Sequence, residues 1–94
     1  MTTLRLLGSG SDHGACPAVY ATDDNGLIVQ GDRIPDGHAV AVPHRLLDWL
    51  EPGMMLPVEA TSTPGVILVP GTPVTDDVRG QLTLDPHETA VEVR

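Results

Sequence analysis

Residues 27–36 read LIVQGDRIPD and residues 67–76 read ILVPGTPVTD, and the two stretches align without a gap. In each, an apolar run leads to a glycine and then to a second short run. A similar alternating run follows each copy, AVAV at 39–42 and AVEV at 90–93. Runs rich in Val and Ile between turn residues predict strands. We therefore expect an internal pseudo-repeat with a two-fold-like β arrangement inside one chain.

The flanking sequence predicts further short elements. Residues 3–7 and 18–22 are strand candidates, and the second should form a hairpin over 19–29. Its turn is Asp23-Asp24-Asn25-Gly26, in which Asn-Gly favours a type I′ geometry. Residues 54–60 are also expected to form a strand, whereas 75–80 are expected to form either one helical turn or a loop.

One short helix is expected near 43–51. Pro43 suits the first helical position, because its missing N–H costs nothing there. Leu46, Leu47 and Leu50 make one apolar stripe, and Pro52-Gly53 ends the segment.

Together these patterns predict a single domain over 1–94, mainly β (α+β). The expected architecture is a small barrel-like or sandwiched sheet with one short helix. The apolar positions expected to fill its core are Val29, Val40, Val42, Leu46, Leu50, Val58, Ile67, Val69 and Val91.

Composition limits the function classes. The net charge is −8, from 13 acids and 5 arginines without any lysine. Such a chain repels phosphate, so nucleic-acid binding and anionic membranes are disfavoured as partners. The sequence shows neither a run of about 20 apolar residues nor a signal-like leader, which predicts a cytoplasmic protein. With 94 residues and no phenylalanine, a homodimer is the expected way to add buried area.

A glycine-rich stretch at 8–14 belongs to the expected functional loop, whose candidate residues are Asp12, His13, Cys16 and Tyr20. The H-x-x-C spacing of His13 and Cys16 can place two ligands on one metal, but a tetrahedral site needs two more. The remaining histidines, at positions 38, 44 and 87, are distant in sequence. Cys16 is a poor candidate nucleophile, because Asp12 and the acidic net charge favour the neutral thiol. We expect no catalytic residue, cofactor or metal ligand.

The acidic residues Asp76, Asp77, Asp85 and Glu88 lack the spacing of a calcium loop. We expect them to form a solvated surface.

Three apolar residues are the candidate interface: Trp49 at the edge of the helix stripe, and Met54 and Met55 just after it. Aromatic side chains are frequent binding hot spots, and methionines widen an adaptable apolar surface.

The segment 8–42 resembles a group of small, uncharacterised actinobacterial proteins. The resemblance rests on Cys16-Pro17-Ala18-Val19-Tyr20, on the acidic-Gly turn at 23–26 and on Val29-Gln30-Gly31. Such proteins are often encoded beside helix-turn-helix regulators, which implies a regulatory accessory role.

Residues 27–70 are more weakly similar to AbrB-type swapped-hairpin regulators and antitoxins. The shared order is a strand ending in Pro43, a Leu-rich helix, Pro52-Gly53, and strands at 56–60 and 65–69. In that fold, two chains interlock into one barrel. The basic residues that the family uses against DNA are nearly absent here, since Arg33 and Arg45 alone lie nearby.

The first functional hypothesis is a non-enzymatic protein–protein interaction module, accessory to a bacterial transcription regulator, whose acidic surface engages a basic partner. One alternative is an AbrB-like swapped-hairpin DNA-binding regulator or antitoxin. Another is a small metal- or thiol-dependent protein that uses His13 and Cys16.

Overall fold

A computed structural model of the protein describes residues 2–10, 17–35 and 38–94. Within these ranges, eight strands form one antiparallel sheet, accompanied by a 3₁₀-helix and a short α-helix. The elements in chain order are β1 (Leu4–Ser9), β2 (Ala18–Thr22), β3 (Leu27–Arg33), β4 (Ala39–Pro43), η1 (His44–Trp49), β5 (Glu59–Ala60), β6 (Val66–Pro70), β7 (Thr72–Pro73), α1 (Asp76–Gln81) and β8 (Glu88–Val93). The predicted mainly β fold with a short helix is confirmed.

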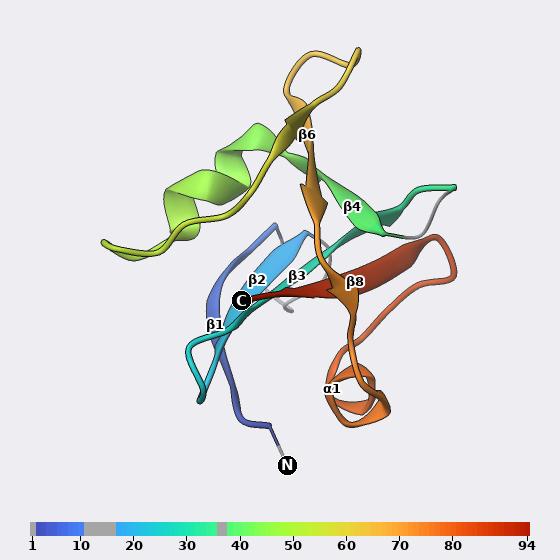
Figure 1. The fold of residues 1–94 in the computed structure, drawn as a ribbon. Coiled ribbons are helices and arrows are strands. Elements are labelled where there is room, and N and C mark those ends of the chain that lie inside the picture. The colour runs from blue at the N-terminus through green and yellow to red at the C-terminus, as the bar shows by residue number, and fades with distance from the viewer. Residues whose placement is uncertain (1, 11–16, 36–37) are drawn as a thin grey trace.

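The strand pairings close on themselves, which gives the sheet its barrel-like form. β3 pairs with β4, and β4 pairs with β6. The chain passes through Gly71 from β6 directly into β7, which pairs with β8. β8 then pairs with β3 and completes the ring. β1 and β2 extend the sheet beside β3, where Figure 1 shows them as the blue strands near the end of β8.

The pairing register follows the sequence repeat. Val29 of β3 lies opposite Val91 of β8, and the equivalent Val69 of β6 lies opposite Val40 of β4. We call β3 of the first copy, and β6 with β7 of the second, the bent strands, and we call β4 and β8 the return strands of the first and second copy. The first part of each bent strand thus pairs with the return strand of the other copy, β3 with β8 and β6 with β4. The second part pairs with the return strand of its own copy, β3 with β4 and β7 with β8. This exchange relates the two copies by an approximate two-fold within one chain.

Each bent strand carries a glycine where the backbones approach closely. A Cβ on Gly31 would lie 2.7 Å from the Ala41 carbonyl oxygen, and one on Gly71 would lie 2.6 Å from the Glu92 carbonyl oxygen. Ala41 and Glu92 occupy equivalent positions in the two return strands. The two glycines are therefore needed for the same reason, which is that a side chain would meet backbone atoms.

The main core fills the barrel and contains most of the predicted positions. Its buried members are Val19, Val29, Val40, Val42, Leu46, Ile67, Val69 and Val91. Leu50 is only partly buried but packs against this cluster. Val58 is 44% exposed, so its prediction as a core residue is wrong. A second, smaller cluster joins Ile28, Val74, Val78 and Ala90 beneath α1.

The segment 54–60 forms less strand than expected, and this explains the exposure of Val58. Only Glu59–Ala60 pairs, as β5 against β6. Pro57 has no N–H to donate to a ladder, so the residues before β5 run as an extended connection without a partner strand among the described residues.

The expected helix is η1, and it adopts 3₁₀ rather than α geometry. Pro43 is its N-cap, and no side chain caps the first turn. A 3₁₀-helix of six residues is longer than usual, because runs beyond three or four residues are uncommon. Leu46 is fully buried, and Trp49, one 3₁₀ turn later, lies on the same side against the core.

Two further local expectations are settled. The segment 75–80 is helical, as α1, with the Thr75 side chain accepting a hydrogen bond from the Val78 N–H. The β2–β3 turn is not type I′, because only Asn25 has positive φ, at 69°. The Thr22 N–H donates to the Gly26 carbonyl, so three residues span the turn and the left-handed one comes last.

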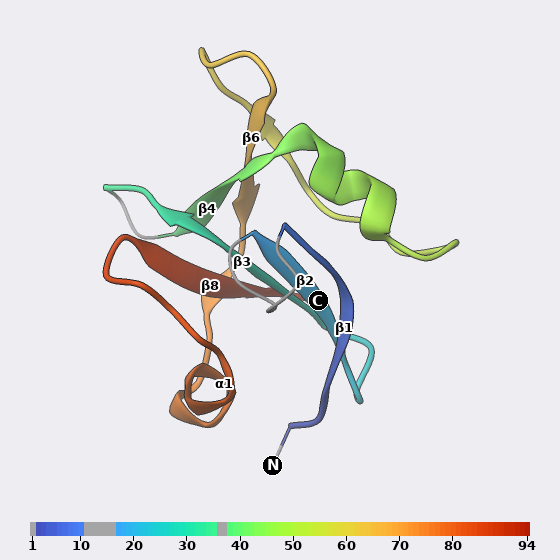
Figure 2. The same ribbon diagram turned by 180° about the vertical axis from the view of Figure 1, so that it is seen from behind.

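The two helices lie at opposite ends of the molecule, as Figures 1 and 2 both show. η1 flanks the upper end with the segment that follows it, and α1 covers the lower end beside the N-terminal strand. Neither helix, nor any other among the described residues, is long and apolar enough to cross a membrane.

Candidate functional site

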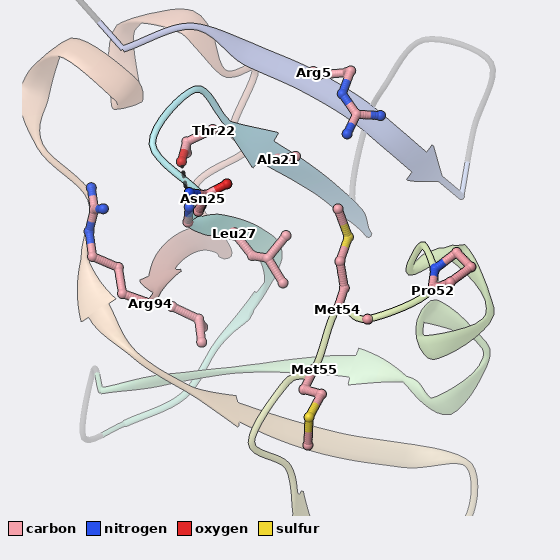
Figure 3. A pocket seen from close by; sticks show the side chains of 12 residues that line it. Arg5, Ala21, Thr22, Asn25, Leu27, Pro52, Met54, Met55 and Arg94 are labelled. Atoms are coloured by element: carbon pink, nitrogen blue, oxygen red, sulfur yellow. Dashed lines mark hydrogen bonds between the residues drawn. The ribbon is translucent and has the colours of Figure 1, made fainter.

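A pocket of about 410 Å³ opens beside the β2–β3 turn and the end of β8. We call it the methionine pocket, because the segment 52–55 borders it with Met54 and Met55 (Figure 3). Ala21, Leu27 and Val93 supply apolar lining from three different strands, β2, β3 and β8. Ala21 and Leu27 are each 7% exposed, so this lining is part of the packed sheet.

The two methionines point in opposite directions from one extended segment. In Figure 3 the Met54 side chain reaches toward Ala21 and β2, whereas the Met55 side chain turns away from them. Met54 is half-buried, and Met55 is 84% exposed. Met54 therefore lines the pocket, and Met55 presents an unburied apolar side chain at its edge.

One wall of the pocket is an arginine–carboxylate clamp. The two terminal nitrogens of Arg5 donate to the two carboxylate oxygens of Glu51, at 2.7 and 2.9 Å. The bond joins β1 to the residue immediately before the 52–55 segment, and this bidentate geometry fixes orientation better than a single contact. The hydrogen bond from Arg5 holds the pKa of Glu51 below its usual value, and Glu51 raises the pKa of Arg5.

The opposite wall is formed by Arg94. Its guanidinium donates to Asp24 at 2.6 Å and lies 2.6 Å from a Glu92 carboxylate oxygen. The hydrogen bond from Arg94 lowers the pKa of Asp24, and a second bond from the Thr22 hydroxyl acts in the same direction. Both arginines at the pocket are thus already paired, and three carboxylates oppose two guanidinium groups.

A second hollow of about 420 Å³ adjoins the methionine pocket. Val93 and Arg94 line both, while Pro57, Gly71 and Thr72 belong to the second one. The connection that carries Met54, Met55 and Pro57 therefore borders both hollows.

The structure separates the three predicted interface residues. Met54 and Met55 lie at the pocket, but Trp49 packs against β1, where a Cβ on Gly8 would lie 2.4 Å from the Trp49 Cγ. Trp49 is half-buried against the main core. It takes the position of a core-edge anchor and holds η1 against the barrel.

The structure describes only part of the predicted functional loop. Asp12, His13 and Cys16 lie outside the described residues. Tyr20 is on β2, partly buried against the second core cluster, and burial raises the pKa of its hydroxyl.

A cluster of candidate metal ligands lies at the other end of β8. Ligand atoms of Asp85, His87 and Glu88 fall within 4.8 Å of one another. The His87 Nε2 is also 3.9 Å from an Asp32 carboxylate oxygen on β3. Glu88 is only 6% exposed, so its prediction as part of a solvated surface is wrong. The carboxylate is buried because Glu88 opens β8 and pairs with Asp32 across the ladder.

Sequence reasoning missed the pocket walls. Arg5 is 46 positions from Glu51, and Arg94 is 70 positions from Asp24. Pairs this far apart leave no spacing pattern, since only the strand order brings them together. The D-x-H-E run at 85–88 was a local signal for the ligand cluster, but its burial and the approach of β3 come from the fold.

Comparison with protein-family models, with curated proteins and with solved structures finds no significant match to the chain.

Proposed function

We propose that this protein is a non-enzymatic binding module, accessory to a bacterial transcription regulator. In this proposal the methionine pocket receives an apolar side chain from a basic segment of the partner. The observation that carries the proposal is Met55, 84% exposed at the edge of a pocket of about 410 Å³. Pockets of roughly 300–1,000 Å³ lined by apolar side chains are usual binding sites.

The pocket lining suits an adaptable apolar contact. Met54 and Met55 have unbranched, polarisable side chains that can repack around different partner groups. Ala21 and Leu27 are held rigidly in the sheet, so the flexible edge stands over a fixed base. Burying Met55 on association would remove apolar area from water and would favour the complex.

The charge around the pocket favours a basic partner. The charged residues that line the pocket are Arg5 and Arg94, whose guanidinium groups are paired with three carboxylates next to the lining, and the whole chain carries −8. Lysine or arginine beside the inserted side chain would be attracted by these carboxylates and by the net negative charge of the chain. Such complementarity raises the association rate and rejects acidic competitors. The resemblance of 8–42 to proteins encoded beside helix-turn-helix regulators supports a regulator as the partner.

Photocrosslinking tests the proposal in the native host. A benzophenone amino acid replaces Met55 in one variant and Ser62, an exposed residue of the β5–β6 turn, in a matched control. We expect position 55 alone to crosslink to a regulator, through a peptide that carries an apolar residue next to Lys or Arg. A covalent dimer of this chain, or equal crosslinking from both positions, would overturn the proposal.

The crosslinked peptide is then synthesised and titrated by fluorescence anisotropy. Met55→Ala should weaken binding by about fivefold to tenfold, the effect of truncating an interface contact worth about 1 kcal/mol. Met55→Leu should retain most of the affinity. A peptide with its basic residues replaced by Glu should not bind. Equal affinity of the wild type and Met55→Ala would reject the pocket as the docking site.

A further inference from the structure

We propose that Asp85, His87 and Glu88 form a binding site for a divalent transition-metal ion such as Zn²⁺. The site lies at the start of β8, whereas the methionine pocket lies at its end. The inference is therefore independent of the proposed function.

The donor set fits such an ion. An imidazole nitrogen with carboxylate oxygens is the mixed set that Zn²⁺ accepts, whereas Ca²⁺ prefers oxygen alone. The ligand atoms of Asp85, His87 and Glu88 lie within 4.8 Å of one another. In a tetrahedral zinc site with bonds of about 2.1 Å, neighbouring ligands are roughly 3.4 Å apart. Asp85 and His87 are exposed, so we expect their side chains to turn toward Glu88 when an ion binds.

The buried Glu88 supplies the fixed point of the site. Its side chain is 7% exposed, and one carboxylate oxygen accepts the Asp85 N–H at 2.9 Å. The other oxygen lies 4.0 Å from the His87 Nε2. A carboxylate held by backbone in a partly dry position is pre-oriented, so a cation entering there loses little ordering entropy.

A further carboxylate approaches His87 from a different part of the chain. Asp32 on β3 pairs with Glu88 across the ladder and brings its carboxylate 3.9 Å from the His87 Nε2. Three carboxylates thus converge on one imidazole. Arg33 lies beside them and donates a hydrogen bond to the Glu88 backbone carbonyl, at 3.1 Å. A divalent cation held by Asp85, His87 and Glu88 would also be attracted by the nearby Asp32 carboxylate.

Titration of metal-free protein with ZnCl₂, measured by calorimetry, tests the site. In a parallel titration Co²⁺ replaces Zn²⁺, and its visible absorption bands report binding. We expect one ion per chain with micromolar affinity. His87→Ala should weaken binding by at least about tenfold, as loss of a ligand requires. His87 is 68% exposed in its side chain, so this variant should remain folded. Glu88→Gln should also weaken binding.

Two control variants make the outcomes decisive. His44→Ala removes an exposed histidine of η1, outside the cluster, and should leave the affinity unchanged. Cys16→Ser should also leave it unchanged. If Zn²⁺ binds the His87→Ala variant as tightly as the wild type, the proposal is wrong. If binding is lost in Cys16→Ser instead, the ion belongs with Cys16 and not with this cluster.

Discussion

Alanine at the two strand-crossing glycines should destabilise the fold strongly and to a similar extent. A Cβ on Gly31 would lie 2.5 Å from the Val42 Cγ1 and 2.7 Å from the Ala41 carbonyl oxygen. A Cβ on Gly71 would lie 2.6 Å from the Glu92 carbonyl oxygen. Real Cβ atoms do not approach this closely, and a backbone oxygen cannot rotate away. Each variant must therefore push two strands apart.

The expected cost follows from overpacking. Inserting a methyl group into a well-packed site costs about 1–3 kcal/mol, and contact with backbone favours the upper half of that range. Replacing glycine also removes unfolded-state entropy, which returns about 0.4–1 kcal/mol. A net loss of roughly 2 kcal/mol should lower the melting temperature by about 8–16 °C in a domain of this size.

Gly80→Ala is the matched control for the same change. Gly80 lies in α1 with no atom within 4 Å of a Cβ, so alanine should stabilise by about 0.5–1 kcal/mol through helix propensity. Thermal and urea unfolding of the three variants decides the matter. If Gly31→Ala and Gly71→Ala have the same melting temperature as Gly80→Ala, the backbones do not approach closely at Gly31 and Gly71 and the reasoning is refuted. If only one of the two is destabilised, the crossings are not equivalent.

Three further predictions address the core, the pocket wall and the turn. Leu46→Ala should cost about 2–5 kcal/mol in urea unfolding, whereas Val58→Ala should cost under about 1 kcal/mol because its side chain is exposed. Arg5 lowers the pKa of Glu51, so this pair stabilises the fold above the unfolded carboxyl pKa of 4.5. The stabilisation is lost as pH falls through the lower pKa of the folded state. The melting temperatures of wild type and Glu51→Gln should therefore differ at pH 7 and converge under strong acid. Asn25→Gly should equal or exceed the wild type in stability and Asn25→Ala should fall below it, because φ is 69°.

Much of the fold was predictable because each copy of the repeat shows a local pattern of apolar residues and turn residues. The apolar runs at 27–29 and 66–69 are each followed two residues later by a glycine, Gly31 or Gly71, and strands and turn residues can be read directly from such runs. The exchange of partners between the copies could not be read in the same way. Val29 and Val69 look alike in sequence, and only their packing decides which return strand each one meets.

The errors lie where local pattern and tertiary context disagree. Val58 continues an apolar alternation from Leu56, but Pro57 and the lack of a partner strand leave it 44% exposed. Glu88 looks like a surface acid beside His87 and Asp85, yet it begins a central strand and is buried. In both cases the burial was set by which strands pair, and this information is absent from a window of neighbouring residues.

The repeat and the candidate sites divide the molecule in a consistent way. The duplicated strands build the symmetric barrel, whereas both sites depend on segments that have no counterpart in the other copy. The methionine pocket uses the 51–55 connection after η1 together with Arg5 of the added strand β1. The ligand cluster uses residues 85–88, which follow α1, whereas in the first copy only five positions of the sequence separate β3 from β4. A symmetric core needs identical packing at both crossings, so Gly31 and Gly71 are equally constrained. The connections that have no counterpart in the other copy carry no such constraint. For that reason, distinct binding chemistry can arise in them without loss of the fold.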